Sequence, residues 1–133
     1  MEAADTSTWS AAALPESVAL LRSAVFDFAD RAGVADPPLG RLQLAVSEAV
    51  TNAVIHAYRH DAHVGTVDVG ATLGDEELRV VVADHGAGFA SRPDSPGAGF
   101  GLMLMKEMAD GIDIRPVEPR GTAVHMSFKV TGG

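Results

Sequence analysis

The chain contains no cysteine and no long apolar run, and these two absences narrow the classes of protein to which it can belong. Without cysteine there are no disulfide bonds, thiolate zinc sites or thiol nucleophiles. No apolar run approaches the ~20 residues of a membrane span, and the start, Met1 to Asp5, lacks the basic residues of a signal peptide. We therefore expect a cytoplasmic protein that does not engage membranes, and its 133 residues suffice for one domain with a core.

Basic residues are also scarce. The chain has 10 lysines and arginines against 18 aspartates and glutamates, a net charge of -8, and only Lys106 and Lys129 are lysines. An acidic surface repels the phosphate backbone, so direct nucleic-acid binding is not expected, although such an excess most often serves solubility. A bound polyphosphate would need local help from a divalent cation, from N–H groups at a helix start or from a few arginines.

Several common catalytic and nucleotide motifs are missing. Neither lysine follows a glycine, which excludes a Walker phosphate loop. The dinucleotide fingerprint fails at both glycine clusters because Ser91 and Leu104 stand where the third glycine would be. There is no Gly-x-Ser-x-Gly elbow and no His-Glu-x-x-His, so a serine hydrolase or a zinc protease lacks support. We interpret His60 and His63 as exposed loop residues.

Hydrophobic spacing predicts two helices first and mostly strands afterwards. Apolar residues repeat at helical spacing in residues 16–33 and 42–58, which predicts a helix in each range. Strands are expected at 9–14, 66–71, 78–83, 112–115 and 122–130, and a third helix at 102–110. We expect residues 1–8 to be disordered and 9–133 to form a single domain. The order of elements predicts an α+β fold, a two-layer sandwich with helices on one face of a mixed, mainly antiparallel sheet.

The second helix carries a polar face that is the first candidate for a functional site. Glu48, Asn52 and His56 are spaced four residues apart, so all three can point to one side. For either Glu48 or Asn52 alone, a polar stripe on a surface helix is the ordinary explanation. Together, the amide oxygen suits Mg²⁺ and the carboxylate can accept a proton from an attacking hydroxyl.

Two glycine clusters complete the candidate pocket. The strand at 78–83 delivers Asp84, whose carboxylate can accept a hydrogen bond from an exocyclic amine such as adenine N6, although a turn residue at a strand end is equally ordinary. Gly86 and Gly88 would let the backbone approach a planar base. The second cluster, residues 97–101, precedes the predicted third helix, whose free N–H groups could cradle phosphates.

Four segments, in order, resemble the N, G1 and G2 boxes and the terminal Gly-Thr of the GHKL, or histidine kinase-like, ATPase superfamily. They are Ser47 to Tyr58, Asp84 to Phe89, Gly97 to Leu102, and Gly121 with Thr122. Within the superfamily the chain is most similar to bacterial anti-sigma factor serine kinases, whose N box commonly contains Ser-Glu-Ala-x-x-Asn and His-x-Tyr. The resemblance covers about residues 14–130, and four boxes in order are far more specific than any one of them.

The resemblance implies the Bergerat-type ATP-binding fold and a role for each motif residue. It implies that Asn52 holds Mg²⁺, that Glu48 is the catalytic base and that Asp84 reads the adenine amino group. The remaining candidate nucleotide contacts lie in or beside the same boxes: His56, Gly86, Gly88, Gly99, Phe100, Gly101, Leu102 and Thr122.

The resemblance also implies an activity. Such proteins use Mg-ATP to phosphorylate a serine or threonine of an anti-sigma factor antagonist of the STAS type, and they sequester a sigma factor in a partner switch. They often dimerise, which allows a homodimer here. The segment between Gly88 and Gly97 is short and offers only Arg92 as a cation. The phosphate charge could therefore be neutralised by Arg92, by Arg120 or by Mg²⁺ alone, and the sequence leaves these alternatives open. The alternatives are a non-catalytic ATP-binding, partner-binding module of the same fold and a detached sensor-kinase domain that phosphorylates histidine.

Overall fold

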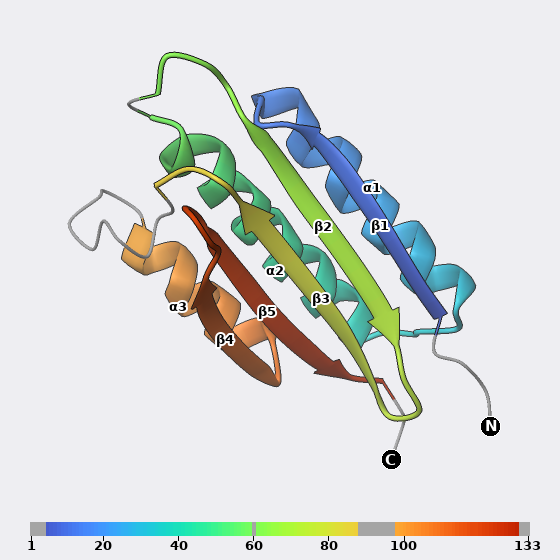
Figure 1. The fold of residues 1–133 in the computed structure, drawn as a ribbon. Helices are drawn as coiled ribbons and strands as arrows, with labels where there is room; N and C mark the ends of the chain where they lie inside the picture. The colour runs from blue at the N-terminus through green and yellow to red at the C-terminus, as the bar shows by residue number, and fades with distance from the viewer. Residues whose placement is uncertain (1–4, 60, 88–97, 131–133) are drawn as a thin grey trace.

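The computed structural model describes residues 5–59, 61–87 and 98–130, which form a five-stranded sheet with helices on one face (Figure 1). The strands are β1 (Asp5–Ala12), β2 (Thr66–Leu73), β3 (Glu77–Asp84), β4 (Gly111–Pro116) and β5 (Thr122–Lys129). Their order across the sheet is β1-β2-β3-β5-β4, and each of these neighbouring pairs is antiparallel. The α+β two-layer prediction is confirmed, with antiparallel pairing at every one of these four contacts.

Helix α1 (Pro15–Arg31) follows from its apolar spacing and its end residues. Leu21 and Val25 lie one turn apart and are both buried, which places one face of the helix against the sheet. Pro15 stands in the first turn, where its missing N–H costs no helical hydrogen bond. Gly33 adopts a positive φ of 91° just beyond the last turn, as the sequence predicted for the stop.

Helix α2 (Pro38–Asn52) lies between α1 and α3 and continues into a π-helical turn, Ala53–Ala57 (Figure 1). We predicted one regular helix to about residue 58, so the π turn is a correction. A π turn holds one residue more than an α turn, and such turns are frequent at functional sites. Here it brings the Ala57 carbonyl within 2.7 Å of the Ala87 backbone N, at the glycine turn that follows β3.

Several element boundaries differ from the sequence prediction, and α2 begins at Pro38 rather than near residue 42. Strand β1 begins at Asp5, so residues 5–8, which we expected to be disordered, pair with β2, and Asp5 lies opposite Leu73. Their alternation of small polar side chains suited an exposed edge strand, a pattern that carries little apolar signal. Helix α3 (Ala98–Met108) begins four residues before the predicted start, so Gly99 and Gly101 lie within its first turn. Residues 1–4 lie outside the described part.

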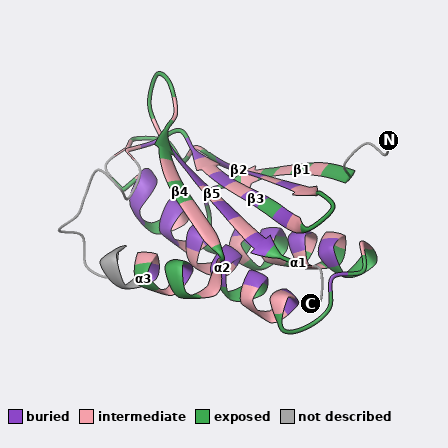
Figure 2. Cartoon of the chain, turned by 90° about the horizontal axis from the view of Figure 1, so that it is seen from below, coloured by how far each residue is buried: buried purple, intermediate pink, exposed green. Residues whose placement is uncertain are grey.

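The core fills the space between the sheet and the helices (Figure 2). Along β3 the burial alternates, and Leu78, Val80 and Val82 point toward the helices. Phe128 of β5 and Met105 of α3 are fully buried in the same cluster. This layering fixes where the strand ends stand relative to α2 and α3. Within the described residues, no helix has both the length and the apolar character needed to cross a membrane.

Candidate functional site

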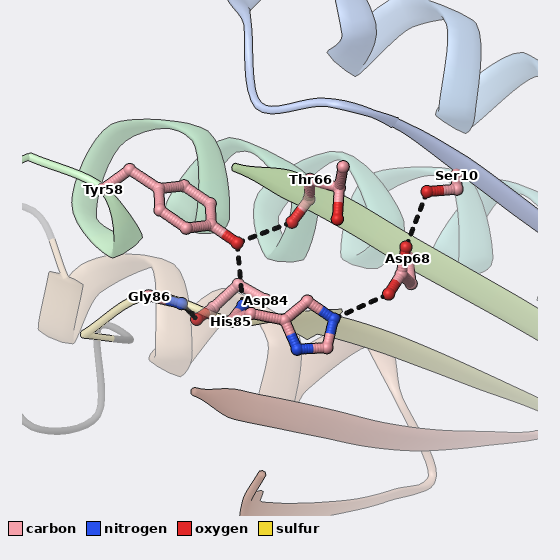
Figure 3. Close-up of polar contacts among 7 residues, drawn as sticks. All are labelled: Ser10, Tyr58, Thr66, Asp68, Asp84, His85 and Gly86. Carbon is pink, nitrogen blue, oxygen red and sulfur yellow. Dashed lines mark hydrogen bonds and ion pairs between the residues drawn. The ribbon is translucent and has the colours of Figure 1, made fainter. Parts of the chain in front are cut away.

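Asp84 and Thr122 meet at one end of the sheet, where β3 ends and β5 begins. They are register partners, and their exposed fractions are only 3% and 6%. The Gly86 backbone N donates a hydrogen bond to Asp84 Oδ1 at 3.0 Å (Figure 3). Burial raises the pKa of Asp84, although hydrogen bonds from the backbone N–H groups of Gly86 and Thr122 oppose the rise. A buried carboxylate with acceptor capacity to spare is suited to an amino group on a flat base.

Two glycines beside Asp84 are required by close backbone contacts. A Cβ added at Gly86 would lie 2.1 Å from the Ala57 carbonyl oxygen. One added at Gly121 would lie 2.1 Å from the Asp84 carbonyl oxygen, and Gly121 also has a φ of +133° that side chains rarely adopt. The backbone around the Asp84 carboxylate is therefore held by contacts that no other residue type allows.

Glu48, Asn52 and Gly101 form a second group, where α2 meets the first turn of α3. A Cβ added at Gly101 would lie 2.8 Å from Asn52 Nδ2 and 3.1 Å from Glu48 Oε1. Asn52 is 5% exposed, and its Nδ2 has no hydrogen-bond partner among the residues that the structure describes. A buried amide without a partner costs about 1–3 kcal/mol, so its position beside a helix start suggests that a ligand satisfies it. Glu48 is half-buried.

His56 is buried one turn beyond Asn52, in the π-helical segment. Its Nδ1 lies 3.0 Å from the Arg59 guanidinium. We expected His56 to share the face of Glu48 and Asn52, and its part in the site stays a prediction. The structure brings Glu48 and Asn52 together at Gly101, and one contact described for His56 is with Arg59.

Some predicted nucleotide contacts cannot be placed. Gly88 and Arg92 lie outside the described residues, as do the side chains at the start of α3, including Phe100. Gly99 stands in the backbone of that first turn, and Leu102 is half-buried against the core. These residues stay predictions.

A divalent cation would depend on few protein ligands. The described residues contain no group of three or more His, Cys, Asp or Glu side chains that could hold a metal ion. The buried Asn52 amide, beside the half-buried Glu48 carboxylate, nevertheless offers hard oxygen ligands of the type that Mg²⁺ accepts. Since Mg²⁺ usually takes only one or two ligands from the protein and the rest from phosphates and water, this donor set fits it.

Three residues of this region were not assigned to the site from the sequence alone. Gly121 was noted only as part of a Gly-Thr pair, and its positive φ is visible only in the folded chain. Tyr58 sends its hydroxyl to the end of β3 (Figure 3). Arg120, which stays open as a neutraliser of phosphate charge, donates to Asp61 at 2.9 Å, and its positive charge opposes the rise in the pKa of Asp84. The His-x-Tyr spacing and the Gly-Thr pair were the available signals.

Comparison with known proteins decides the family. The profile of the histidine kinase-like ATPase domain matches residues 11–128. The chain belongs to this family. It is 33% identical over 126 residues to an anti-sigma F factor from Pasteuria penetrans, covering 86% of this chain and 84% of the relative. It is 34% identical over 128 residues to the serine-protein kinase RsbW from Bacillus licheniformis, covering 85% and 80%.

A solved structure supports the fold of this histidine kinase-like ATPase. The structure of the RsbU and RsbW domains of Rv1364c from Mycobacterium tuberculosis aligns with a TM-score of 0.74, at 20% identity, over 96% of this chain and 34% of that chain. At that identity the match shows the fold alone. The family, the fold and the use of ATP that the family implies are therefore established, while the roles of single residues rest on the geometry given above.

Proposed function

We propose that this histidine kinase-like ATPase is an anti-sigma factor that binds Mg-ATP and phosphorylates a serine or threonine of a STAS-type antagonist protein. The observation that carries the proposal is the buried Asn52 side chain beside Glu48 at the start of α3: its Nδ2 has no hydrogen-bond partner among the described residues, so it is free to donate to a ligand oxygen. Relatives named anti-sigma F factor and serine-protein kinase RsbW support the activity and the two kinds of partner. Sequestration of the sigma factor would be released when the antagonist competes for this chain.

The site divides into two parts with different tasks. We call Asp84, Gly86, Gly121 and Thr122 the adenine side, because a buried carboxylate and close backbone suit a flat base with an amino group. We call Glu48, Asn52 and Gly101 the phosphate side. The N–H groups at the start of α3 and the positive end of that helix favour the anionic phosphates there, in a chain whose net charge is otherwise -8.

In the transfer step, Glu48 orients the substrate hydroxyl and accepts its proton. The serine oxygen bonds to the γ-phosphorus while the bond from that phosphorus to the bridging oxygen breaks, and ADP leaves. A Mg²⁺ ion held by Asn52 would neutralise charge on the phosphate oxygens. General-base catalysis of this kind contributes about 10²- to 10⁴-fold to a rate.

The test is incubation with γ-labelled ATP, Mg²⁺ and a purified STAS-type antagonist. We expect acid-stable label on a serine or threonine of the antagonist, and none when the acceptor residue is replaced by alanine. Nucleotide binding without transfer would instead identify a non-catalytic partner-binding module. Acid-labile label would indicate phosphohistidine and a detached sensor-kinase domain.

A further inference from the structure

The hydroxyl of Tyr58 joins two strands at the point where their ladder ends. The last register pair of β2 and β3 at this end is Val67 with Asp84. One step further, Tyr58 donates to the Thr66 carbonyl oxygen at 2.7 Å and accepts from the His85 backbone N at 2.8 Å (Figure 3). The hydroxyl therefore continues the cross-strand bonding by one position, directly beyond Asp84.

The ring of Tyr58 is fixed as firmly as its hydroxyl. A Cβ added at Gly65 would lie 2.4 Å from Tyr58 Cε1 and Cζ, and one added at Gly86 would lie 2.9 Å from Tyr58 Cδ1. Glycines on both sides thus let the backbone close onto the ring. Burial raises the pKa of Tyr58, so the hydroxyl keeps the proton that it donates to Thr66.

These contacts converge on the turn that orients the Asp84 carboxylate. Its Oδ1 accepts from the Gly86 N–H, so the carboxylate direction depends on where the backbone of His85 and Gly86 runs. Tyr58 holds the first of these residues by a hydrogen bond and the second by ring contact. The Ala57 carbonyl adds a third tie, through the Ala87 N–H.

We propose that Tyr58 is a positioning residue for base selectivity: through the His85 N–H it fixes the Asp84 carboxylate in the direction that recognises the amino group of adenine. The inference rests on the proposed nucleotide site. Tyr58 does not touch the nucleotide in this account. It acts through the backbone between Asp84 and Gly86, which it contacts from its position directly after the π turn.

Further hydrogen bonds run from the His85 side chain along the face of the sheet that the helices do not cover, and one of them supplies a matched control. His85 Nε2 lies 2.8 Å from Asp68 Oδ2, and Ser10 donates to Asp68 Oδ1 at 2.6 Å (Figure 3). Ser10→Ala removes a hydroxyl with a bond as short as those of Tyr58, but this hydroxyl reaches the turn only through the Asp68 carboxylate and the His85 side chain and makes no hydrogen bond to the described backbone of the turn. Tyr58→Phe removes the hydroxyl and keeps the ring between its two glycines.

The experiment is calorimetric titration of the full chain and both variants with ADP and with inosine diphosphate, which lacks the amino group. We expect the unaltered chain and Ser10→Ala to prefer ADP. Tyr58→Phe should lose about tenfold in ADP affinity while inosine diphosphate affinity is unchanged, so the preference collapses. Equal loss for both nucleotides, or no loss, would overturn the inference. Failure of the unaltered chain to bind either nucleotide would overturn the proposed function first.

A second measurement avoids any dependence on the folding of the variant. Tyr58 is the only tyrosine in the chain, so incorporation of 3-fluorotyrosine labels this position alone. We expect its fluorine resonance to shift more with ADP than with inosine diphosphate, because only the adenine amino group engages Asp84. An identical response to the two nucleotides, or no response, contradicts the proposal.

Discussion

The two sides of the candidate site differ in how far their polar groups are already satisfied. On the adenine side, Asp84 accepts from Gly86, and the surrounding backbone is fixed by contacts that only glycine permits. On the phosphate side, Nδ2 of the buried Asn52 has no hydrogen-bond partner among the described residues, and Glu48 stands half-exposed beside it. The comparison indicates that base recognition is built into the fold, whereas the phosphate side is completed by its ligand.

The largest expected effect separates turnover from binding. Glu48→Gln keeps the size of the side chain and removes the proton acceptor, so phosphotransfer should fall by about 10²- to 10⁴-fold with ATP affinity unchanged. Labelled-ATP transfer and calorimetry measure the two quantities. Glu107→Gln, which removes an exposed carboxylate from α3, is the matched control. A Glu48→Gln protein that keeps most of its turnover would remove Glu48 from the mechanism.

The adenine side should be the more sensitive to backbone change. Gly121→Ala forces a Cβ to 2.1 Å from the Asp84 carbonyl at a φ of +133°, and we expect a loss of about 3 kcal/mol in the free energy of unfolding. Gly33→Ala is the control, since it has a positive φ of 91° but open space around the added Cβ. It should cost about 1–2 kcal/mol. Chemical denaturation measures the free energy of unfolding of both variants. Equal losses would show that the close contact with the Asp84 carbonyl adds no destabilisation beyond that of the positive φ.

The phosphate side should show the reverse relation between stability and binding. Asn52→Leu replaces a buried amide whose Nδ2 is unsatisfied by an apolar group of similar size, so the ligand-free protein should be as stable as the parent or gain up to about 1 kcal/mol. Its affinity for Mg-ATP should fall about tenfold or more. Thermal melting with and without Mg-ATP reports both. A large loss of stability without ligand would mean that the amide is satisfied within the protein.

The smallest expected effect is a pH dependence on the adenine side. Burial raises the pKa of Asp84, so the carboxyl takes up a proton at a higher pH than an exposed aspartate does. ATP affinity should therefore decline, by no more than about tenfold per pH unit, as the pH falls through that raised value. Folding carries the opposite sign: the stability contributed by the raised pKa is complete below the unfolded value and is lost as pH rises through the folded one. Asp84→Asn should abolish the pH dependence, and a persisting dependence would assign it to another group.

Much of the fold followed from apolar spacing, and the exceptions have physical causes. The alternation in β3 and the four-residue spacing in α1 were visible because burial on one face imposes them. The start of β1 at Asp5 was missed because an exposed edge strand of small polar residues carries little such signal. The early start of α3 was missed because the glycines in its first turn disfavour a helix locally, while packing against α2 overrides that preference.

The site was predictable to a similar degree. The sequence placed Asp84 at a strand end and Glu48 with Asn52 on one helix face, and the structure has both arrangements. The π turn at Ala53–Ala57 was not predictable, because a tertiary contact of Ala57 accompanies it and residue propensity does not indicate it. The role of Tyr58 depends on hydrogen bonds between residues far apart in the chain, which spacing alone does not reveal.

Calorimetric titration of the unaltered chain with ATP and with GTP, each with and without Mg²⁺, tests the two-sided site most directly. We expect ATP to bind at least about tenfold more tightly than GTP, because Asp84 accepts from an amino group that guanine lacks at that position. We also expect Mg²⁺ to strengthen binding of both, because the phosphate side is common to them. Equal binding of ATP and GTP, or no effect of Mg²⁺, would contradict the division of the site into an adenine side and a phosphate side.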